Sequence, residues 1–346
     1  MDYTPSPDPE NIQPANTCIS CGSPDILPGY PNKLCAACRN KFIKLNVPLW
    51  IKLFGAGIAV IMLISIIWLP GNLKAALALA RGEKAELSRN YITEQNELEK
   101  AKKSVPQSVD ILSHLVIAGF NNGDFKTVLS SLNDLENRTI DDSALVSKLN
   151  DIAARTKDYF PSDSLTKVLD VYKNKSVPDT VYQRYLRKSP MDVFALISLA
   201  SAYAGEEKYK SCDSILSTIL VIDHAYAPAL NLKTMVKREL NDPDSSIYYC
   251  DQTLEINHQA LYALSSKSRT LLKTGKNQEG LKLAEECYDL DKSMSYNLAT
   301  LAIAYHLNKD YKHRDAIIAV AAKDSDSESY MKYAKDIISN KVKFQN

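Results

Sequence analysis

The feature that most constrains this chain of 346 residues is an apolar run close to its N-terminus. From Val47 to Leu69 the only charged or hydroxyl side chains are Lys52 and Ser65. The run is 23 residues long, whereas roughly 20 residues are enough for a helix to cross the hydrocarbon core of a bilayer. A soluble helix seldom stays apolar on every face over such a length. The run therefore predicts a transmembrane helix at residues 47–69.

The residues that flank the run support an anchor rather than a cleaved leader. Trp50 and Trp68 lie about 27 Å apart on a helix, which matches the separation of the two membrane interfaces that indole rings prefer. Some 46 residues precede the run, more than a signal peptide has. Pro70 and Gly71 are expected to end the helix. The mixture of Ala, Leu, Glu and Lys that follows predicts an amphipathic stalk helix at residues 71–104.

Four of the seven cysteines stand in two CxxC pairs before the apolar run. Cys18 and Cys21 are separated from Cys35 and Cys38 by 13 residues, and four thiolates complete a closed tetrahedron around Zn²⁺. A redox dithiol or free thiols are the alternatives. Residues 17–44 resemble the short zinc ribbons at the start of many prokaryotic membrane proteins. This resemblance implies a structural Zn²⁺ ion.

Composition favours an all-α chain that begins with a disordered tail. Residues 1–16 hold four prolines and little to bury, so they are expected to be disordered. Only 11 glycines occur in the chain, fewer than strand-rich folds usually carry. Within residues 107–190 a helical hairpin is predicted, with helices at Val109–Phe120 and Phe125–Leu135. The rest of that segment is helical in composition but shows no clean period.

The last third of the chain repeats itself every 34 residues. Four blocks begin at Val193, Ala227, Leu261 and Ser295, and each predicts two antiparallel helices joined by a short turn. The first and last blocks show the clearest pattern, as in LASAYAGEEKYKSC and LAIAYHLNKDY. This pattern resembles the tetratricopeptide repeat. The resemblance implies an α-solenoid of four repeats and a capping helix over residues 191–343.

The resemblance also implies a concave groove lined by the first helix of each repeat, where a protein or peptide partner binds. Positions two, five, nine, twelve and thirteen of the repeats are expected to face this groove. These positions include Phe194, Ile197, Met235, Arg238, Tyr262, Arg269, Lys273, Tyr296, Ile303 and His306. Their aromatic and basic groups suit an extended or helical peptide with some acidic character. Alternatively, some of them pack between repeats.

The sequence gives no support for catalysis or for nucleic-acid binding. Cys212, Cys250 and Cys287 fall on second helices, where they are expected to be buried fillers. His224 and His258 share one turn position, where helix termination explains them better than a metal site. No nucleophile, phosphate-loop or metalloprotease motif is present, so we predict no enzyme. Lys plus Arg (42) balances Asp plus Glu (41), so no basic field attracts nucleic acid.

Charges beside the apolar run favour an N-terminus inside the cell, since more Lys and Arg precede the run than follow it. A thiolate zinc site also persists best in a reducing compartment. The repeats are then outside, in the periplasm of a cell with two membranes. We therefore predict a membrane-anchored interaction scaffold. A transmembrane relay from the groove to the zinc ribbon is the alternative, and a ribbon that only stabilises the anchor is a third interpretation.

Overall fold

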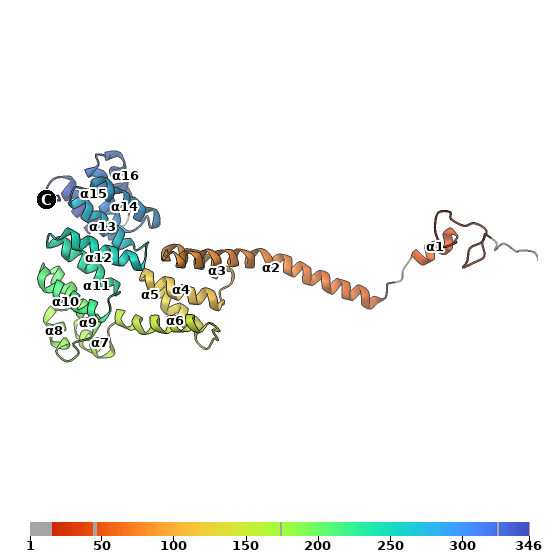
Figure 1. Cartoon of the computed structure of the whole chain (residues 1–346), viewed down its shortest axis with the longest axis horizontal. Coiled ribbons are helices and arrows are strands. Elements are labelled where there is room, and N and C mark those ends of the chain that lie inside the picture. Colours follow the sequence, from red (N-terminus) through yellow and green to blue (C-terminus); the bar gives the residue numbers. More distant parts are fainter. Residues whose placement is uncertain (1–15, 44–46, 174, 324, 346) are drawn as a thin grey trace, which may run out of the picture. The chain divides into compact units, whose positions relative to one another are not determined.

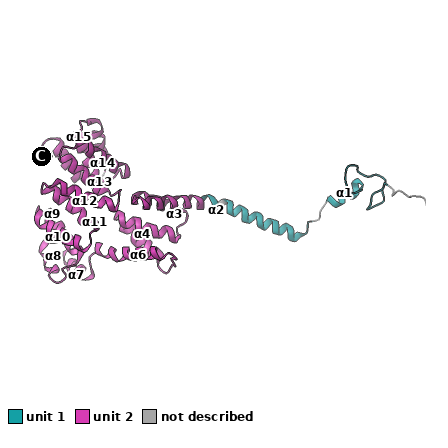
Figure 2. Ribbon diagram, viewed as in Figure 1, with its two compact units in different colours: residues 1–70 teal, residues 71–346 magenta. Residues whose placement is uncertain are grey.

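The computed structural model describes residues 16–43, 47–173, 175–323 and 325–345, apart from the side chains of Ile67, Trp68 and Ser325. Every regular element in these ranges is a helix. The chain divides into two units, residues 1–70 and 71–346 (Figure 2). Except for Asn16, the predicted tail lies outside the described residues. The side chain of Trp68 does too, so the predicted tryptophan pair is not described.

The first unit contains the paired cysteines, α1 (Ala36–Ile43) and the start of α2 (Leu49–Leu87). The predicted helix end at Pro70 is wrong, because α2 continues through this proline to Leu87. Inside a helix, proline removes one hydrogen-bond donor and its ring clashes with the carbonyl four residues earlier, at a cost of about 3 kcal/mol, and this kinks a helix without always ending it. The side chains from Leu49 to Ile66 are all exposed. By length and composition, α2 is the one helix among the described residues that could cross a membrane.

The second unit begins with the end of α2 and three further helices, α3 (Tyr91–Ser104), α4 (Val109–Asn122) and α5 (Phe125–Leu135). The predicted single stalk helix over residues 71–104 is wrong. The chain turns after Leu87, and α3 and the end of α2 both pack on α4 through a shared apolar core. This core includes Ala75, Leu98 and Leu115. The predicted α4–α5 hairpin is confirmed.

Three helices connect α5 to the repeats. They are α6 (Ser143–Thr156), α7 (Asp163–Leu169) and α8 (Asp179–Leu186), with 3-10 turns at Lys157–Tyr159 and Asp170–Tyr172. α7 has 7 residues and α8 has 8, which is about two turns each and explains why this part of the sequence shows no clean helical period. Only α8 has extensive contact with the helix that follows it.

Eight helices form the repeats, and their spacing confirms the 34-residue period (Figure 1). The first helices are α9 (Val193–Gly205), α11 (Ala227–Glu239), α13 (Leu261–Lys273) and α15 (Ser295–Leu307). The second helices are α10 (Tyr209–Ile222), α12 (Pro243–Ile256), α14 (Asn277–Leu290) and α16 (Tyr311–Ala321). Each helix pair packs as an antiparallel hairpin and each hairpin packs on the next. The arrangement is a tetratricopeptide-type α-solenoid.

The turn inside each repeat has the same backbone geometry. Glu207, Asn241, Gly275 and Lys309 follow one another at intervals of 34 residues, and all four have positive φ angles between 59° and 82°. Only one of them is a glycine, the residue that adopts this conformation at the lowest cost. The repeat therefore imposes the left-handed turn even where the residue type does not favour it.

Small residues hold the two helices of a repeat close together. Cys212 donates to the backbone oxygen of Ala200 over 3.1 Å, and Ser246 Oγ donates to that of Thr234 over 2.9 Å. Cys212, Cys250 and Cys287 are all fully buried, which confirms the prediction that they act as fillers. These thiol and hydroxyl groups stand where an alanine would also fit, and their hydrogen bonds leave none of their polar atoms unpaired.

The C-terminal segment folds back on the last repeats. A capping helix was predicted at residues 329–343, and α17 (Glu328–Ile338) is shorter than this. Met331 and Ile337 of α17 are buried against the core of α15, and Phe344 is buried in the same core. Gln345 Nε2 donates to the Leu272 backbone oxygen over 2.9 Å. The segment therefore covers α15 and reaches back to α13.

Helices α3 to α6 form an N-terminal layer, which lies beside the repeats rather than extending them (Figure 1). Arg155 of α6 pairs with Asp223 over 3.0 Å, in the turn that follows α10. Asn257, in the turn after α12, donates to Asn122 Oδ1 over 3.1 Å. Tyr226 OH donates to the backbone oxygen of Asp158 over 3.1 Å. These contacts hold the N-terminal layer against one edge of the solenoid.

Candidate metal centre and interaction cleft

The four N-terminal cysteines converge on one point. Their Sγ atoms all lie within 4.8 Å of one another, and Cys21 Sγ is 3.5 Å from Cys35 Sγ. A tetrahedron with metal–sulfur bonds of about 2.3 Å places its sulfurs about 3.8 Å apart. A disulfide would require about 2.05 Å, and all four cysteines are free. This group can therefore bind a metal ion.

Local backbone structure positions each pair of thiols. The first pair sits on a turn in which Gly22 N donates to the Cys18 backbone oxygen over 2.8 Å and Gly22 has a φ of +73°. The second pair flanks the start of α1, where Cys38 N donates to Cys35 Sγ over 3.4 Å. Hydrogen bonding from the backbone of Cys35 lowers the pKa of the Cys18 thiol to about 6, which favours its thiolate form. The pKa of Cys21 shifts the other way, to about 12, because a backbone hydrogen bond at Ser23, which acts to lower it, is outweighed by hydrogen bonds with the three neighbouring thiols. The turn geometry and the one low-pKa thiol are typical of thiolate metal sites.

A cleft of about 600 Å³ lies between the N-terminal layer and the repeats. It is bounded by the turn between α4 and α5 on one side and by the starts of α11 and α13 on the other. Its lining includes Phe125, Tyr159, Asn231, Asn257, Tyr262 and Met294. Lysine, arginine and histidine are absent from the described lining, which contains two acids, Asp124 and Asp291. The cleft is therefore aromatic and amide-rich, with a slight negative charge.

Most amide groups of this cleft already have partners, but one acceptor does not. Asn257 Nδ2 donates to Asn121 O over 3.1 Å, and Gln259 Nε2 donates to Thr93 Oγ1 over 2.8 Å. Asn231 Oδ1 is buried without a hydrogen-bond donor. An unpaired buried acceptor costs about 1–3 kcal/mol. Asn231 therefore favours a ligand that brings an N–H group.

Of the ten residues predicted for the groove, Tyr262 alone lines this cleft. Asn231 is not among the predicted groove residues, although it occupies the fifth position of its repeat, one of the positions expected to face the groove. Phe194 instead lines a separate cleft of about 600 Å³ together with Phe160 and Met191. Ile197 and Met235 are half-buried against the core of the first two repeats.

Three predicted groove residues gather in an arginine–tyrosine cluster at α13, α15 and α17. The rings of Tyr262 and Tyr296 stack with centroids 5.0 Å apart, and the Arg269 guanidinium lies 4.0 Å from the Tyr296 centroid. The Arg269 guanidinium also lies 5.7 Å from the ring centroid of Tyr333 of α17. Tyr296 and Arg269 are buried. The C-terminal helix therefore covers this part of the first-helix surface.

The remaining predicted groove residues are largely committed to contacts within the protein. Arg238 is 5% exposed, and its Nε lies 3.3 Å from Glu239 Oε1. Lys273 lies 3.7 Å from the same carboxylate. Ile303 is fully buried against α17. His306 is half-buried, and burial together with the nearby Arg314 charge lowers its pKa.

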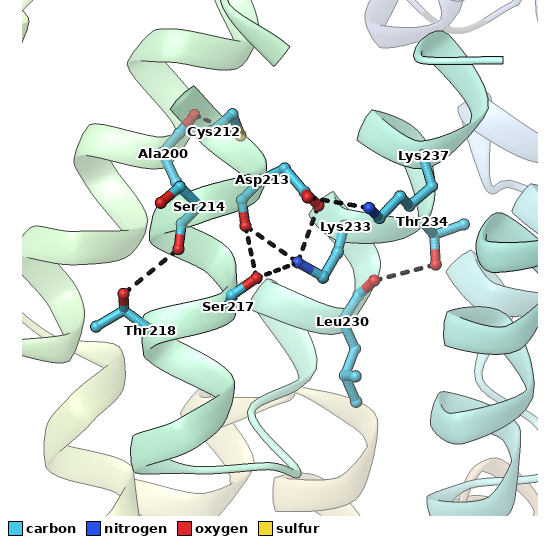
Figure 3. A network of polar contacts seen from close by, with 10 residues as sticks. All are labelled: Ala200, Cys212, Asp213, Ser214, Ser217, Thr218, Leu230, Lys233, Thr234 and Lys237. Atoms are coloured by element: carbon cyan, nitrogen blue, oxygen red, sulfur yellow. Dashed lines mark hydrogen bonds and ion pairs between the residues drawn. The ribbon is translucent and has the colours of Figure 1, made fainter. Parts of the chain in front are cut away.

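An ion pair with a buried lysine joins the first two repeats (Figure 3). The side chain of Lys233 is 3% exposed, and its Nζ donates to Asp213 Oδ1 over 2.9 Å and to Ser217 Oγ over 2.7 Å. Lys237 approaches the other oxygen of Asp213, also at 2.9 Å. Lys233 occupies a position where the repeat pattern asks for a large apolar group. Charge pairing here replaces apolar packing.

Known proteins resemble this chain in structure only at low identity. No protein-family model and no curated protein matches it. YrrB, a TPR protein with an unusual peptide-binding site, is 15% identical with a TM-score of 0.37, covering 54% of this chain and 96% of its own. A tetratricopeptide repeat protein from Parabacteroides merdae ATCC 43184 is 15% identical with a TM-score of 0.42, covering 68% and 87%. For yeast Tom70 the values are 14%, 0.38, 77% and 64%.

Proposed function

We propose that this chain is a membrane-anchored interaction scaffold that binds an extended segment of a protein partner in the cleft between α4 and α13. The Asn231 amide, which lines this aromatic cleft, carries the proposal: its Oδ1 is buried without a donor, and a rotation of the side chain toward the cleft lets it accept a backbone N–H of such a segment. Tyr262, Phe125 and Tyr159 offer surfaces for its side chains. The slight negative charge of the cleft suits a neutral or basic segment better than the acidic one predicted from the sequence.

Two further parts belong to this proposal. The exposed apolar stretch of α2 is the membrane anchor, because exposed apolar side chains over such a length need a lipid environment. The four-cysteine group holds a structural Zn²⁺ ion through Cys18, Cys21, Cys35 and Cys38, with the N-terminus in the cytosol and the repeats outside. Four thiolate ligands leave no open position for a substrate, so the ion supports folding.

Site-specific photo-crosslinking tests the cleft. With p-benzoylphenylalanine in place of Tyr262, we expect a discrete crosslinked adduct in cells. The same residue in place of Tyr248, which is 56% exposed on α12 outside the cleft, is the control and should give none. Adding Asn231→Ala should lower the yield of the adduct about fivefold to tenfold, since one hydrogen bond is worth about 1 kcal/mol.

Equal adducts from both crosslinker positions would contradict the proposal that the partner binds in the cleft. An adduct whose yield is unaffected by Asn231→Ala would contradict it as well. Mass spectrometry of the adduct also tests the orientation. An exported partner supports repeats that lie outside the cytosol. A cytosolic partner would reverse the proposed orientation but leave the cleft assignment intact.

Cobalt substitution tests the zinc site. Adding Co²⁺ to the metal-free full-length protein in detergent should produce the intense sulfur-to-cobalt absorption of a tetrathiolate centre, and one equivalent of Zn²⁺ should remove it. Cys21→Ser should weaken this absorption strongly, whereas Cys212→Ser, in the buried repeat core, should leave it unchanged. An unchanged spectrum in Cys21→Ser would rule out the four-thiolate assignment.

A further inference from the structure

A second cluster of potential metal ligands lies where α2, α3 and α4 meet. Glu86 of α2, Glu94 of α3 and His114 of α4 place their ligand atoms within 4.8 Å of one another. His114 Nδ1 is 2.6 Å from Glu86 Oε2 and 3.8 Å from Glu94 Oε1. These residues are spread over 28 positions of the chain and form no sequence motif, so nothing in the sequence predicts their convergence.

Glu94 is the most unusual member of the cluster. Its side chain is fully buried, and neither of its carboxylate oxygens has a hydrogen-bond donor. A buried carboxylate without a partner is costly, so either a proton or a cation must compensate it. Burial and the Glu86 charge raise the pKa of Glu94 to about 9, which makes a proton the competing solution.

The surroundings of the cluster are negatively charged. Glu83 Oε1 of α2 is 3.9 Å from His114 Nε2, and Tyr91 of α3 lies beside the buried Glu94 and the half-buried Glu86. Lys148 of α6 is the nearby cation, 2.5 Å from Glu86 Oε1. One lysine thus faces three carboxyl groups. This imbalance favours a divalent cation at the point where Glu86, Glu94 and His114 converge.

We propose that Glu86, Glu94 and His114 bind one first-row divalent transition-metal ion. One imidazole and two carboxylates form a ligand set that suits Mn²⁺, Fe²⁺ or Zn²⁺. Side-chain rotations bring such ligands to the usual 2.0–2.2 Å from an ion. The three ligands come from three helices, so the bound ion ties the end of α2 to α3 and α4.

Mn²⁺ is the probe that separates this site from the cysteine group, because thiolates prefer softer metals. The full-length protein is first given one equivalent of Zn²⁺, which the four thiolates take up, and is then titrated with Mn²⁺ while electron paramagnetic resonance measures the free ion. We expect one bound Mn²⁺ per chain. Glu94→Gln should weaken binding at least tenfold, because a side chain that binds the ion directly contributes at least as much as one that only hydrogen-bonds to a ligand.

Two further variants make the result specific. Glu97→Gln, on the same helix but paired with Arg81 and Lys100, should bind Mn²⁺ like the unmodified protein. Lys148→Met should bind it several times more tightly, because a competing positive charge is removed. Far-UV circular dichroism confirms that each variant is folded. Failure of the unmodified protein to bind one equivalent, or binding by Glu94→Gln with unchanged affinity, would show that a proton rather than a metal compensates Glu94.

Discussion

Replacing Asp213 with alanine is expected to lower the free energy of unfolding by about 3–5 kcal/mol, because it leaves the buried Lys233 ammonium without its carboxylate. Urea unfolding of the full-length protein, followed by far-UV circular dichroism, measures the change. A second substitution, Lys233→Met, should restore most of the loss, since an apolar side chain of similar size suits the same position.

Asp251→Ala is the matched control for this prediction. Asp251 also pairs with a lysine of the next repeat, Lys267, at 2.5 Å, but the two side chains are 43% and 25% exposed. An exposed pair contributes about 0–1 kcal/mol, so this variant should be almost as stable as the unmodified protein. Equal losses in Asp213→Ala and Asp251→Ala would show that burial of Lys233 does not determine the effect.

The loss caused by Asp213→Ala should also depend on pH. Burial acts to raise the pKa of Asp213, but hydrogen bonds and charges from Lys233 and Lys237 outweigh it and hold the pKa below its usual value. A carboxyl group with a lowered folded-state pKa stabilises the protein fully above its unfolded-state pKa of about 3.9. This stabilisation is lost as pH falls through the folded-state pKa. The difference between the two proteins should therefore shrink below about pH 4.

Gly280→Ala is expected to lower the free energy of unfolding by about 1–3 kcal/mol. A Cβ atom at this position would lie 2.7 Å from Leu272 Cγ and 3.0 Å from the Ser268 backbone oxygen. Leu272 is fully buried and has no room to move away. The clash therefore outweighs the gain of about 1 kcal/mol that alanine offers over glycine inside a helix.

The control for this prediction is Gly205→Ala. Gly205 is the last residue of α9, and a Cβ atom there would meet no neighbour within 4 Å. The same substitution should leave stability unchanged or raise it by up to about 1 kcal/mol. Thermal unfolding of the two variants should thus shift in opposite directions. A stabilising Gly280→Ala would mean that the α13–α14 contact is loose.

The repeat region was predictable because its information is local and recurs. Side chains at one position of each block meet the same neighbours, so the four predicted first-helix starts agree with the structure to the residue. In the middle blocks, Thr234 and Ser268 occupy position eight, where the repeat pattern asks for a small apolar residue. Each block still forms a close contact between its two helices. Thr234 accepts a hydrogen bond from Ser246, and Ser268 donates one to Gly280.

The candidate cleft was predictable only in part. Tyr262 was found from its repeat position, but the cleft exists because helices from an unrelated part of the chain lie against the repeats. Phe120, Phe125 and Tyr159 contribute three of its four aromatic residues from positions that no repeat pattern covers. The arginine–tyrosine cluster was not predictable for the same reason. Tyr333 of α17 covers Arg269, and these two residues are far apart in sequence.

The sequence by itself determined the elements whose causes lie within a few residues or one repeat: the apolar stretch of α2, the paired cysteines, the α4–α5 hairpin and the 34-residue solenoid. Tertiary structure decided what depends on contact between distant segments. Contacts between distant helices fold the expected stalk into a hairpin of the end of α2 and α3, which packs on α4. Further contacts hold α3 to α6 against the repeats. The tertiary structure also brought Glu86, Glu94 and His114 together. The spacing of apolar residues along a helix shows which of its faces is buried, whereas the packing of the whole domain determines which segment covers that face.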